Sequence, residues 1–405
     1  MVYIFVLIIL LVGLNYDKSS NTRGAKTWWR FEWLVLVLLA ALRYRVGGDT
    51  LSYQDTYDYL PNLNELLLSS FAYLPNQPLW YVFCGLCKLA SEEFWFFQIV
   101  HAIILNAVIF WYIKRYSHRP FLSILFYAIM LYTYYNMEIL KQSLTLCCFL
   151  LSYPYLEQRK FLRYYMLATL GFLFHTVGAL LFLLPPLYWY IYNKGERGTL
   201  IYVLITFLGI SIVSEFTSLG NELNNLGMTA ISGKMISYSR TGEVNLYNGF
   251  MGILYVIIVR LIPLFLFLKY NKFDSKSSYA ITTIYFILQG LGVSLIFMHR
   301  VVELLNIPFY VILVNSIDTQ LIQKGTNTSA YDYYDIQKSQ NAKLAVMLLL
   351  VVICYVKYSY YTLDRTSFNN GAPARFYHLY TPYYSIFDPQ IDQRRENVYW
   401  GHFNN

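Results

Sequence analysis

The sequence predicts an all-α, polytopic transmembrane helical bundle of about 12 crossings, and its composition carries that prediction. Of the 405 residues, 57% are hydrophobic and only 13% are charged, against about 25% charged residues in a soluble domain. The mean hydropathy is +0.39. Uncharged runs such as 1–14, 33–42 and 201–213 approach the roughly 20 apolar residues that span a bilayer. A core sealed from water could not bury this much apolar surface, whereas lipid can.

In the first half of the chain, each predicted crossing is an apolar run bounded by polar or basic turns. The first run lacks the basic start and small-residue cleavage site of a signal peptide, so we expect a retained anchor. The run 78–91 is short, and we expect it to be re-entrant or interfacial. The crossings predicted here are 2–14, 28–46, 94–113, 120–136, 139–155, 162–175 and 176–192. Pro185 and Pro186 leave a second possibility, in which 162–184 is one crossing.

The second half adds the predicted crossings 199–215, 248–269, 279–297, 301–316 and 343–361. Basic residues gather in alternate loops, and the positive-inside rule places these loops in the cytoplasm. They contain Lys18, Arg23, Lys26, Arg30, Lys114, Arg115, Arg119, Arg159, Lys160, Arg163, Lys194, Arg197, Lys269, Lys272, Lys276, Lys324, Lys338 and Lys343. Both termini then lie outside, provided that 78–91 does not cross.

Longer polar stretches fall between the crossings or after them. Residues 47–75 and 216–247 are predicted to be outer loops, and 318–342 an inner loop. The tail 362–405 is rich in Tyr, Asp and Arg and is predicted on the outer face. The expected organisation is therefore a bundle over 1–361 and a polar aromatic C-terminal tail, with no separate soluble domain.

The composition also disfavours several other classes of function. The net charge of +8 does not indicate nucleic-acid binding, because basic residues concentrate in cytoplasmic loops of membrane proteins. Cys84 and Cys87 form a C-x-x-C in an apolar run without the βαβ context of a redox pair, and all five cysteines are expected to be packing residues. Interfacial belts explain part of the 41 tyrosines, and aromatic platforms for a ligand could explain the rest.

A cluster of polar residues follows the second predicted crossing. The string R-V-G-G-D-T-L-S-Y places Arg45, Asp49 and Tyr53 on one short outer segment. Its glycines allow a turn and the close approach of a ligand to the backbone. The structural alternative is a helix end whose residues Arg43 and Arg45 snorkel to the interface, with Asp49 as a cap.

Three further residues are expensive to place near the bilayer and are therefore functional candidates. Glu138 and Lys141 lie three apart at the start of an apolar run, so they are expected to share a helix face, and an intrahelical pair is the simpler reading. His175 ends the string L-G-F-L-F-H. It could be a hydrogen-bonded packing residue or a proton carrier active near neutral pH.

More cations fall on the predicted outer side. Arg240 lies in the second outer loop, and His299-Arg300 joins two crossings, whereas Arg260 lies midway along a helix. Guanidinium groups match phosphate and pyrophosphate, and tyrosine rings suit sugars. A lipid-linked sugar pyrophosphate would use both. Walker, H-E-x-x-H and G-x-S-x-G motifs and metal-ligand spacings are absent from the sequence, so we expect no metal and no cofactor.

The string at 45–53 resembles the R-x-G-x-D-x-x-x-Y opening of EpsG-like proteins, relatives of the Wzy O-antigen polymerases. Later features follow the order of that family: E-I-L-K-Q-S at 138–143, E-Q-R-K-F at 157–161, F-H at 174–175, H-R at 299–300 and P-Y-Y at 382–384. There are two departures. Lys141 stands where the family pattern has Arg, and Asn76-Gln77-Pro78 stands where an acidic residue is expected.

The resemblance implies a GT-C-like glycosyltransferase of the bacterial inner membrane, involved in exopolysaccharide, capsule or O-antigen assembly. It would join oligosaccharide repeat units on undecaprenyl pyrophosphate, with lipid-linked donor and acceptor and other polysaccharide-assembly proteins as candidate partners. In this hypothesis Arg45, Lys141, Arg240 and Arg300 neutralise the pyrophosphate, and Tyr53 orients the sugar. The base is His175 or Asp49, with His175 preferred because a neutral imidazole needs no unusual pKa.

Two other classes compete with this hypothesis. A flippase or transporter of lipid-linked glycans would also need outer cations, but its charges should continue through the bundle, whose centre is apolar apart from Arg260. A membrane O-acyltransferase acting on polysaccharide would use a histidine in an apolar helix, and His175 lies in an apolar run. Such an enzyme takes its acyl donor from the cytoplasm, yet the predicted inner loops are short except for 318–342.

Overall fold

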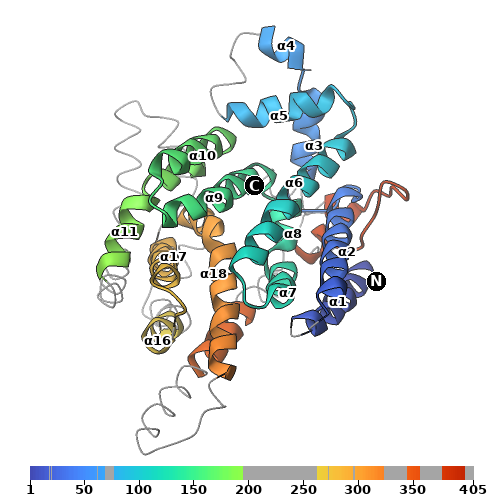
Figure 1. Ribbon diagram of the computed structural model, residues 1–405. Helices are drawn as coiled ribbons and strands as arrows, with labels where there is room; N and C mark the ends of the chain where they lie inside the picture. The colour runs from blue at the N-terminus through green and yellow to red at the C-terminus, as the bar shows by residue number, and fades with distance from the viewer. Residues whose placement is uncertain are drawn as a thin grey trace, which may run out of the picture. The chain divides into compact units, whose positions relative to one another are not determined.

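The computed structural model describes residues 1–61 (except 18 and 20), 63–68, 77–194, 262–294 (except 272), 297–322, 344–355 and 376–396. Every regular element in these ranges is a helix, and the β-pairing described there is limited to isolated bridges, Arg43 with Ser385 and Ser385 with Asp388 (Figure 1). The all-α prediction is thereby confirmed. The chain forms two compact units, residues 1–182 with 354–405, and residues 183–353.

The first unit contains the helices that carry or flank the predicted site residues of the N-terminal half. They are α1 (Val2–Gly13), η1 (Leu14–Tyr16), α2 (Thr22–Ala41), α3 (Thr50–Tyr59), α4 (Leu63–Leu68), α5 (Pro78–Lys88), α6 (Phe94–Tyr116), α7 (Pro120–Met130), α8 (Tyr132–Met137), α9 (Leu140–Glu157), α10 (Phe161–Phe174), η2 (Thr176–Phe182) and η5 (Phe376–Leu379). Helix α6 packs against both α2 and α9, and α9 packs against α10.

The second unit contains α11 (Leu184–Lys194), α16 (Ile262–Tyr270), α17 (Lys276–Ser294) and α18 (Phe297–Ile322). Helix α17 packs against α11, α16 and α18. Asn271 donates to Ser316 at 2.8 Å and Tyr188 donates to Ser277 at 2.9 Å, which satisfies polar groups between apolar helices. Of the predicted crossings, 199–215 and most of 248–269 lie outside the described residues.

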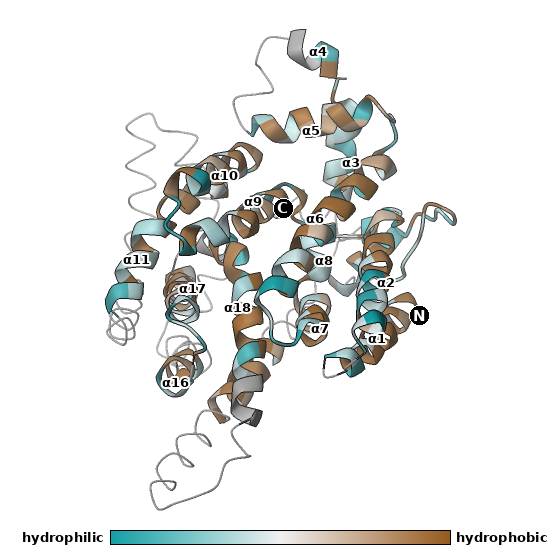
Figure 2. Ribbon diagram, viewed as in Figure 1, coloured by the Kyte–Doolittle hydropathy of each residue, from teal (hydrophilic) through white to brown (hydrophobic). Residues whose placement is uncertain are grey.

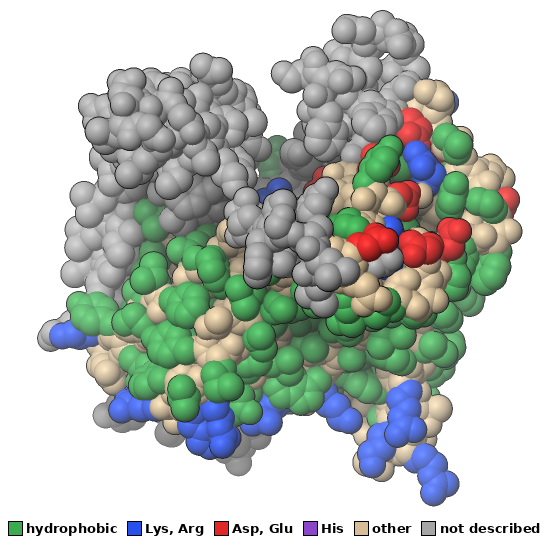
Figure 3. Space-filling view, turned by 90° about the horizontal axis from the view of Figure 1, so that it is seen from above, with side chains coloured by type: hydrophobic (Ala, Val, Ile, Leu, Met, Phe, Trp, Pro, Cys, Tyr) green, Lys and Arg blue, Asp and Glu red, His purple; other side chains and the backbone are tan. Residues whose placement is uncertain are grey.

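The surface of the described residues is unusually apolar for a protein in water. Figure 2 shows hydrophobic residues over most of α1 and α6, and the face in Figure 3 is largely hydrophobic, with acidic side chains gathered in one area. Large apolar side chains are exposed on several helices, among them Phe5 at 66%, Leu162 at 77% and Met166 at 62%. Such exposure is costly in water and suits a lipid environment.

One described helix, Phe94–Tyr116, is long and apolar enough to cross a bilayer. The helices Val2–Tyr16, Pro120–Met130, Phe161–Phe174 and Leu344–Tyr355 are apolar but shorter. The predicted run 120–136 is divided at Leu131 into α7 and α8, so it is not one continuous helix. The figure of about 12 crossings therefore stays a prediction.

The chain reverses direction at His175, after α10. The 3-10 segment η2 runs back along α10, because Tyr164 donates to the Leu181 carbonyl at 2.8 Å and the Tyr165 and Phe182 rings stack at 5.9 Å. A Cβ atom on Gly178 would come within 2.5 Å of the Phe172 backbone nitrogen, so glycine permits this close approach. Residues 162–182 therefore form two elements, α10 and η2, and whether 162–184 makes one crossing or parts of two stays a prediction.

Four of the five cysteines are buried and free, as expected of packing residues. The exception is Cys354, which is exposed, so its assignment as a packing residue is wrong for the described structure. It lies on an apolar stretch with exposed neighbours such as Val351 and Tyr355, and a side chain there faces outward.

Candidate functional site

The turn after α2 packs against the junction of α8 and α9. Arg45 adopts a φ of 53° and Gly47 a φ of 125°. A Cβ atom on Gly47 would overlap the Met137 carbonyl oxygen, and one on Gly48 would lie 2.9 Å from Glu138 Cγ. Gly47 is thus required by the backbone-to-backbone approach as well as by its φ, whereas Gly48 makes room for the Glu138 side chain.

Thr50 fixes this contact from the first turn of α3. Its hydroxyl is within hydrogen-bonding distance of the Val46 carbonyl at 2.9 Å and of the Met137 carbonyl at 3.0 Å. Because Thr50 is fully buried, these bonds hold the turn and the helix junction in one arrangement. Two stretches that the sequence separates by about ninety residues, 45–53 and 138–143, are therefore packed side by side.

Lys141 lies in the first turn of α9 and is surrounded by aromatic rings. Its Nζ atom is 5.3 Å from the ring centroid of Trp80 and 5.8 Å from those of Tyr53 and Tyr81. Within the described part of the chain, no carboxylate pairs with it. An ammonium that is stabilised by ring quadrupoles keeps its charge available for an anion.

The expected shared face of Glu138 and Lys141 is wrong. Glu138 is the C-cap of α8, and α9 begins only at Leu140 after Ile139 has turned the chain with ψ at 53°. The three-residue spacing therefore does not fall on one helix. The carboxyl group of Glu138 lies against Gly48 instead.

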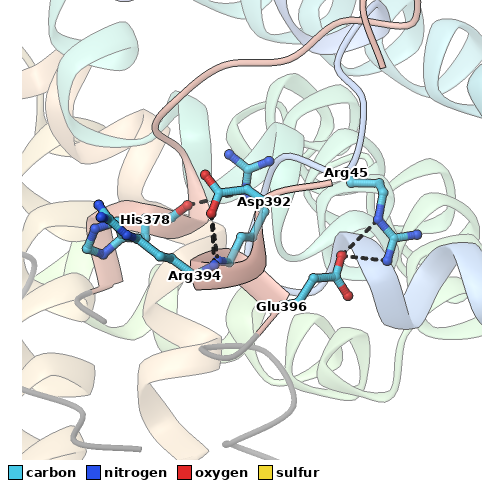
Figure 4. Close-up of polar contacts among 6 residues, drawn as sticks. Arg45, His378, Asp392, Arg394 and Glu396 are labelled. Carbon is cyan, nitrogen blue, oxygen red and sulfur yellow. Dashed lines mark hydrogen bonds and ion pairs between the residues drawn. The ribbon is translucent and has the colours of Figure 1, made fainter. Parts of the chain in front are cut away.

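Arg45 and Arg43, two residues apart, have different surroundings. Arg43 is 1% exposed and donates to the Val46 carbonyl at 3.1 Å and to the Ala40 carbonyl. It therefore closes the end of α2 and does not snorkel, so that alternative does not hold for Arg43. Arg45 is partly exposed and donates from Nε and Nη2 to Glu396 Oε1, at 2.9 Å and 2.6 Å (Figure 4).

Asp49 is the N-cap residue of α3, but its side chain accepts no capping hydrogen bond. The structural explanation for an acidic residue here, a helix cap, is therefore not supported. Its carboxylate is half-buried beside Gly48 and one turn before Tyr53. The position suits a group that meets a ligand held by the cations.

His175 follows Phe174, whose ring packs on the aromatic cluster that also contacts Tyr53. The Val177 backbone N–H donates to His175 Nδ1 at 3.1 Å. Since Nδ1 accepts in this bond, the proton of the neutral ring sits on Nε2. In this arrangement Nδ1 accepts from Val177 and Nε2 carries the proton.

Two predicted site residues lie outside the described part of the first unit. Arg240 lies outside the described residues, and Arg300 lies on α18 of the second unit. Their roles stay predictions. The described residues contain no group of three or more His, Cys, Asp or Glu side chains that could hold a metal ion.

Sequence reasoning missed Trp80, Glu396 and His101. His101 is fully buried in α6, and its Nε2 atom lies 2.8 Å from Ser143 Oγ and 3.1 Å from the Leu140 carbonyl. It thereby fixes the first turn of α9, where Lys141 lies. A polar residue inside an otherwise apolar helix was the available signal for His101.

The polar tail also carries contacts to the site turn. Burial raises the pKa of Tyr383 to about 12, with Arg43 acting in the opposite direction, so the phenol is neutral and donates to the Leu39 carbonyl at 2.9 Å. The Tyr44 N–H donates to the Tyr384 carbonyl at 2.8 Å. The string P-Y-Y thus docks the tail beside the turn that carries Arg45.

The EpsG family model matches residues 26–385, which include both halves of this site. The chain belongs to the EpsG family. No curated protein and no solved structure matches it. Membership of the EpsG family implies a membrane protein with a role like that of a polysaccharide polymerase, a glycosyltransferase-like activity on lipid-linked polysaccharide substrates. The resemblance seen in the sequence is thereby confirmed.

Proposed function

We propose that this EpsG-family chain joins oligosaccharide repeat units carried on undecaprenyl pyrophosphate, at the outer face of the bacterial inner membrane. The observation that carries the proposal is the packing of the Gly47–Gly48 turn on the α8–α9 junction. It combines Arg45, Asp49, Tyr53 and Lys141, two cations with a carboxylate and an aromatic surface. Cations beside rings match a pyrophosphate attached to a sugar.

The reaction needs little beyond charge stabilisation and one proton transfer. A hydroxyl oxygen of the acceptor unit bonds to the anomeric carbon of the growing glycan, and the bond from that carbon to the pyrophosphate oxygen breaks. Lipid pyrophosphate leaves with the electron pair, and Arg45 and Lys141 neutralise its charge. Asp49 takes the acceptor proton, while His175 donates a hydrogen bond from Nε2 and Tyr53 contacts a sugar. Arg240 and Arg300 are proposed as additional phosphate ligands.

Deletion of the gene and analysis of the lipid-linked glycans tests this function. Accumulation of single repeat units on the outer leaflet is the expected result, because assembly and flipping would proceed without polymerisation. Repeat units held on the cytoplasmic leaflet would instead identify a flippase. A polymer of normal length that lacks acyl groups would identify an O-acyltransferase.

His175 provides a test of the donor role. Glutamine places an amide N–H near the position of Nε2 but cannot act as a base at neutral pH. We expect His175→Gln to stay within about threefold of the native polymerisation rate, and His175→Ala to fall about tenfold. The measurement is polymer formed per minute in membranes with matched protein levels. An equal loss of polymerisation rate in both variants would indicate that His175 acts as the base.

Lys141 provides a test of the charge in the aromatic cage. Methionine retains the unbranched side chain and removes the ammonium, so we expect Lys141→Met to lower the polymerisation rate by about tenfold to a hundredfold. Lys141→Arg keeps the charge and restores the residue of the family pattern, and it should retain most activity. Full activity in the methionine variant would remove Lys141 from the phosphate site.

A further inference from the structure

The C-terminal segment 376–396 is folded onto the site turn by backbone pairing. The Gly47 N–H donates to the Leu379 carbonyl at 2.9 Å, and the Ile386 N–H donates to the Leu42 carbonyl at 2.9 Å. Tyr3 of α1 adds a bond from its hydroxyl to the Tyr380 carbonyl at 3.0 Å. These contacts join both edges of the turn to residues more than 300 positions later in the chain.

A short helical turn at the end of this segment presents Glu396. Asp392 starts it by accepting from the Arg394 N–H at 2.9 Å and the Arg395 N–H at 3.3 Å (Figure 4). Arg395 is 1% exposed and is held by the His378 carbonyl at 3.2 Å and by the Pro382 carbonyl. Glu396 therefore follows a buried anchor, and its backbone position is fixed.

Glu396 contacts one edge of the Arg45 guanidinium group. Both Nε and Nη2 donate to the single oxygen Oε1, and the side chains of Arg45 and Glu396 are 22% and 13% exposed. Among the described residues, none accepts a hydrogen bond from Nη1 of Arg45. The edge formed by Nη1 and Nη2 is the one that binds phosphate oxygens as a fork.

We propose that Glu396 is a positioning residue, which holds Arg45 from the side so that its outer edge binds the pyrophosphate. The inference rests on the proposed function, because it assigns the anion at that edge to the substrate. It makes the C-terminal segment a part of the active site. A flexible arginine loses side-chain entropy when it binds an anion, and a carboxylate that orients it beforehand reduces this cost.

The pair Lys88–Glu92 serves as an internal comparison. It is an ion pair of 3.3 Å in the same unit, but the Glu92 side chain is 72% exposed. A pair with one exposed partner contributes little, since water screens the Glu92 carboxylate and its side chain is not fixed by burial. Glu92→Gln is therefore the matched control for Glu396→Gln.

The experiment measures polymerisation by the full chain in proteoliposomes at a series of lipid-linked substrate concentrations, with inorganic pyrophosphate as a competing probe. For Glu396→Gln we expect the KM and the inhibition constant for pyrophosphate to rise about tenfold, with kcat within about twofold. Glu396→Asp should recover part of this loss, and Glu92→Gln should match the native protein. Thermal melting in detergent verifies that each variant is folded.

Reversing the pair separates positioning from simple stabilisation. The double variant Arg45→Glu with Glu396→Arg keeps an ion pair, so it should regain thermal stability lost in the single variants. It should not regain activity, because the cation then projects from the C-terminal segment and no longer from the turn after α2. Restored activity in the reversed pair would overturn the proposal, as would native or tighter pyrophosphate inhibition in Glu396→Gln.

The same data distinguish this inference from the proposed function. If Arg45→Ala abolishes pyrophosphate inhibition and Glu396→Gln does not weaken it, the phosphate role of Arg45 stands and the positioning role of Glu396 is wrong. If Arg45→Ala itself leaves inhibition and rate unchanged, the anion site assumed by the proposed function is wrong, and the role of Glu396 falls with it.

Discussion

Replacing Arg45 with alanine is expected to lower polymerisation by about a hundredfold or more while the protein remains folded. The guanidinium group is partly exposed and offers its outer edge to an anion, so its main loss is charge stabilisation of departing pyrophosphate. Removal of one preorganised donor at a site of developing charge typically costs about 10²–10³ in rate. The measurement is the rate of polymer formation in vesicles containing equal amounts of native and variant protein.

Arg394 is the matched control, because it is an exposed arginine two residues before Glu396 on the same segment. Arg394→Ala should retain the native rate, which would show that net charge alone does not set activity. Arg45→Lys should recover only part of the loss, since an ammonium cannot bind phosphate as a fork. Near-native polymerisation by Arg45→Ala would contradict the assignment.

The sequence alone indicated candidate site residues where chemically distinctive residues stand close together in the chain. The R-V-G-G-D string combines a charge, two glycines and a carboxylate in five residues, and each of these has a meaning that does not depend on distant parts of the chain. Lys141 was found for the same reason, as a charge in an apolar run. The turn that carries Arg45 and Asp49 does pack against Met137, because the glycines permit this close approach.

The partner of Arg45 could not be predicted in this way. Glu396 lies 351 residues away, and pairing at that distance leaves no periodic signal in a single sequence. Trp80 was also missed as a site residue, because an apolar run such as 78–91 reads equally well as packing. Its ring meets Lys141 only once α5 and α9 have folded together.

Hydropathy located two of the breaks between elements and missed one. The turns at Ile139 and His175 fall where one predicted crossing ends and the next begins, but the turn at Leu131 lies inside the predicted run 120–136. A hydropathy window averages over the break at Leu131, and neither glycine nor proline marks that position. The turn at Ile139 lies beside Lys141, and another turn is at His175 itself. Irregular backbone therefore occurs at two of the candidate site residues.

Substituting Gly47 with valine is expected to abolish activity and to destabilise the first unit by about 2–4 kcal/mol. A β-branched residue disfavours the φ of 125°, and its Cβ atom would overlap the Met137 carbonyl oxygen. The turn would then have to move away from α8 and break the Thr50 bonds to Val46 and Met137. Arg45 and Lys141 would no longer lie in one site.

The measurement is thermal unfolding in detergent together with the polymerisation rate. Gly85→Ala is the control, because the added Cβ atom in helix α5 would lie 3.3 Å from Leu63 Cα. This tight contact requires a small shift, which the higher helix propensity of alanine offsets. That variant should unfold within a few degrees of the native protein. A Gly47→Val variant that unfolds at the native temperature and polymerises normally would contradict this prediction. The contact of the turn with the α8–α9 junction would then not hold the site together, and Arg45 and Lys141 would not act as one site.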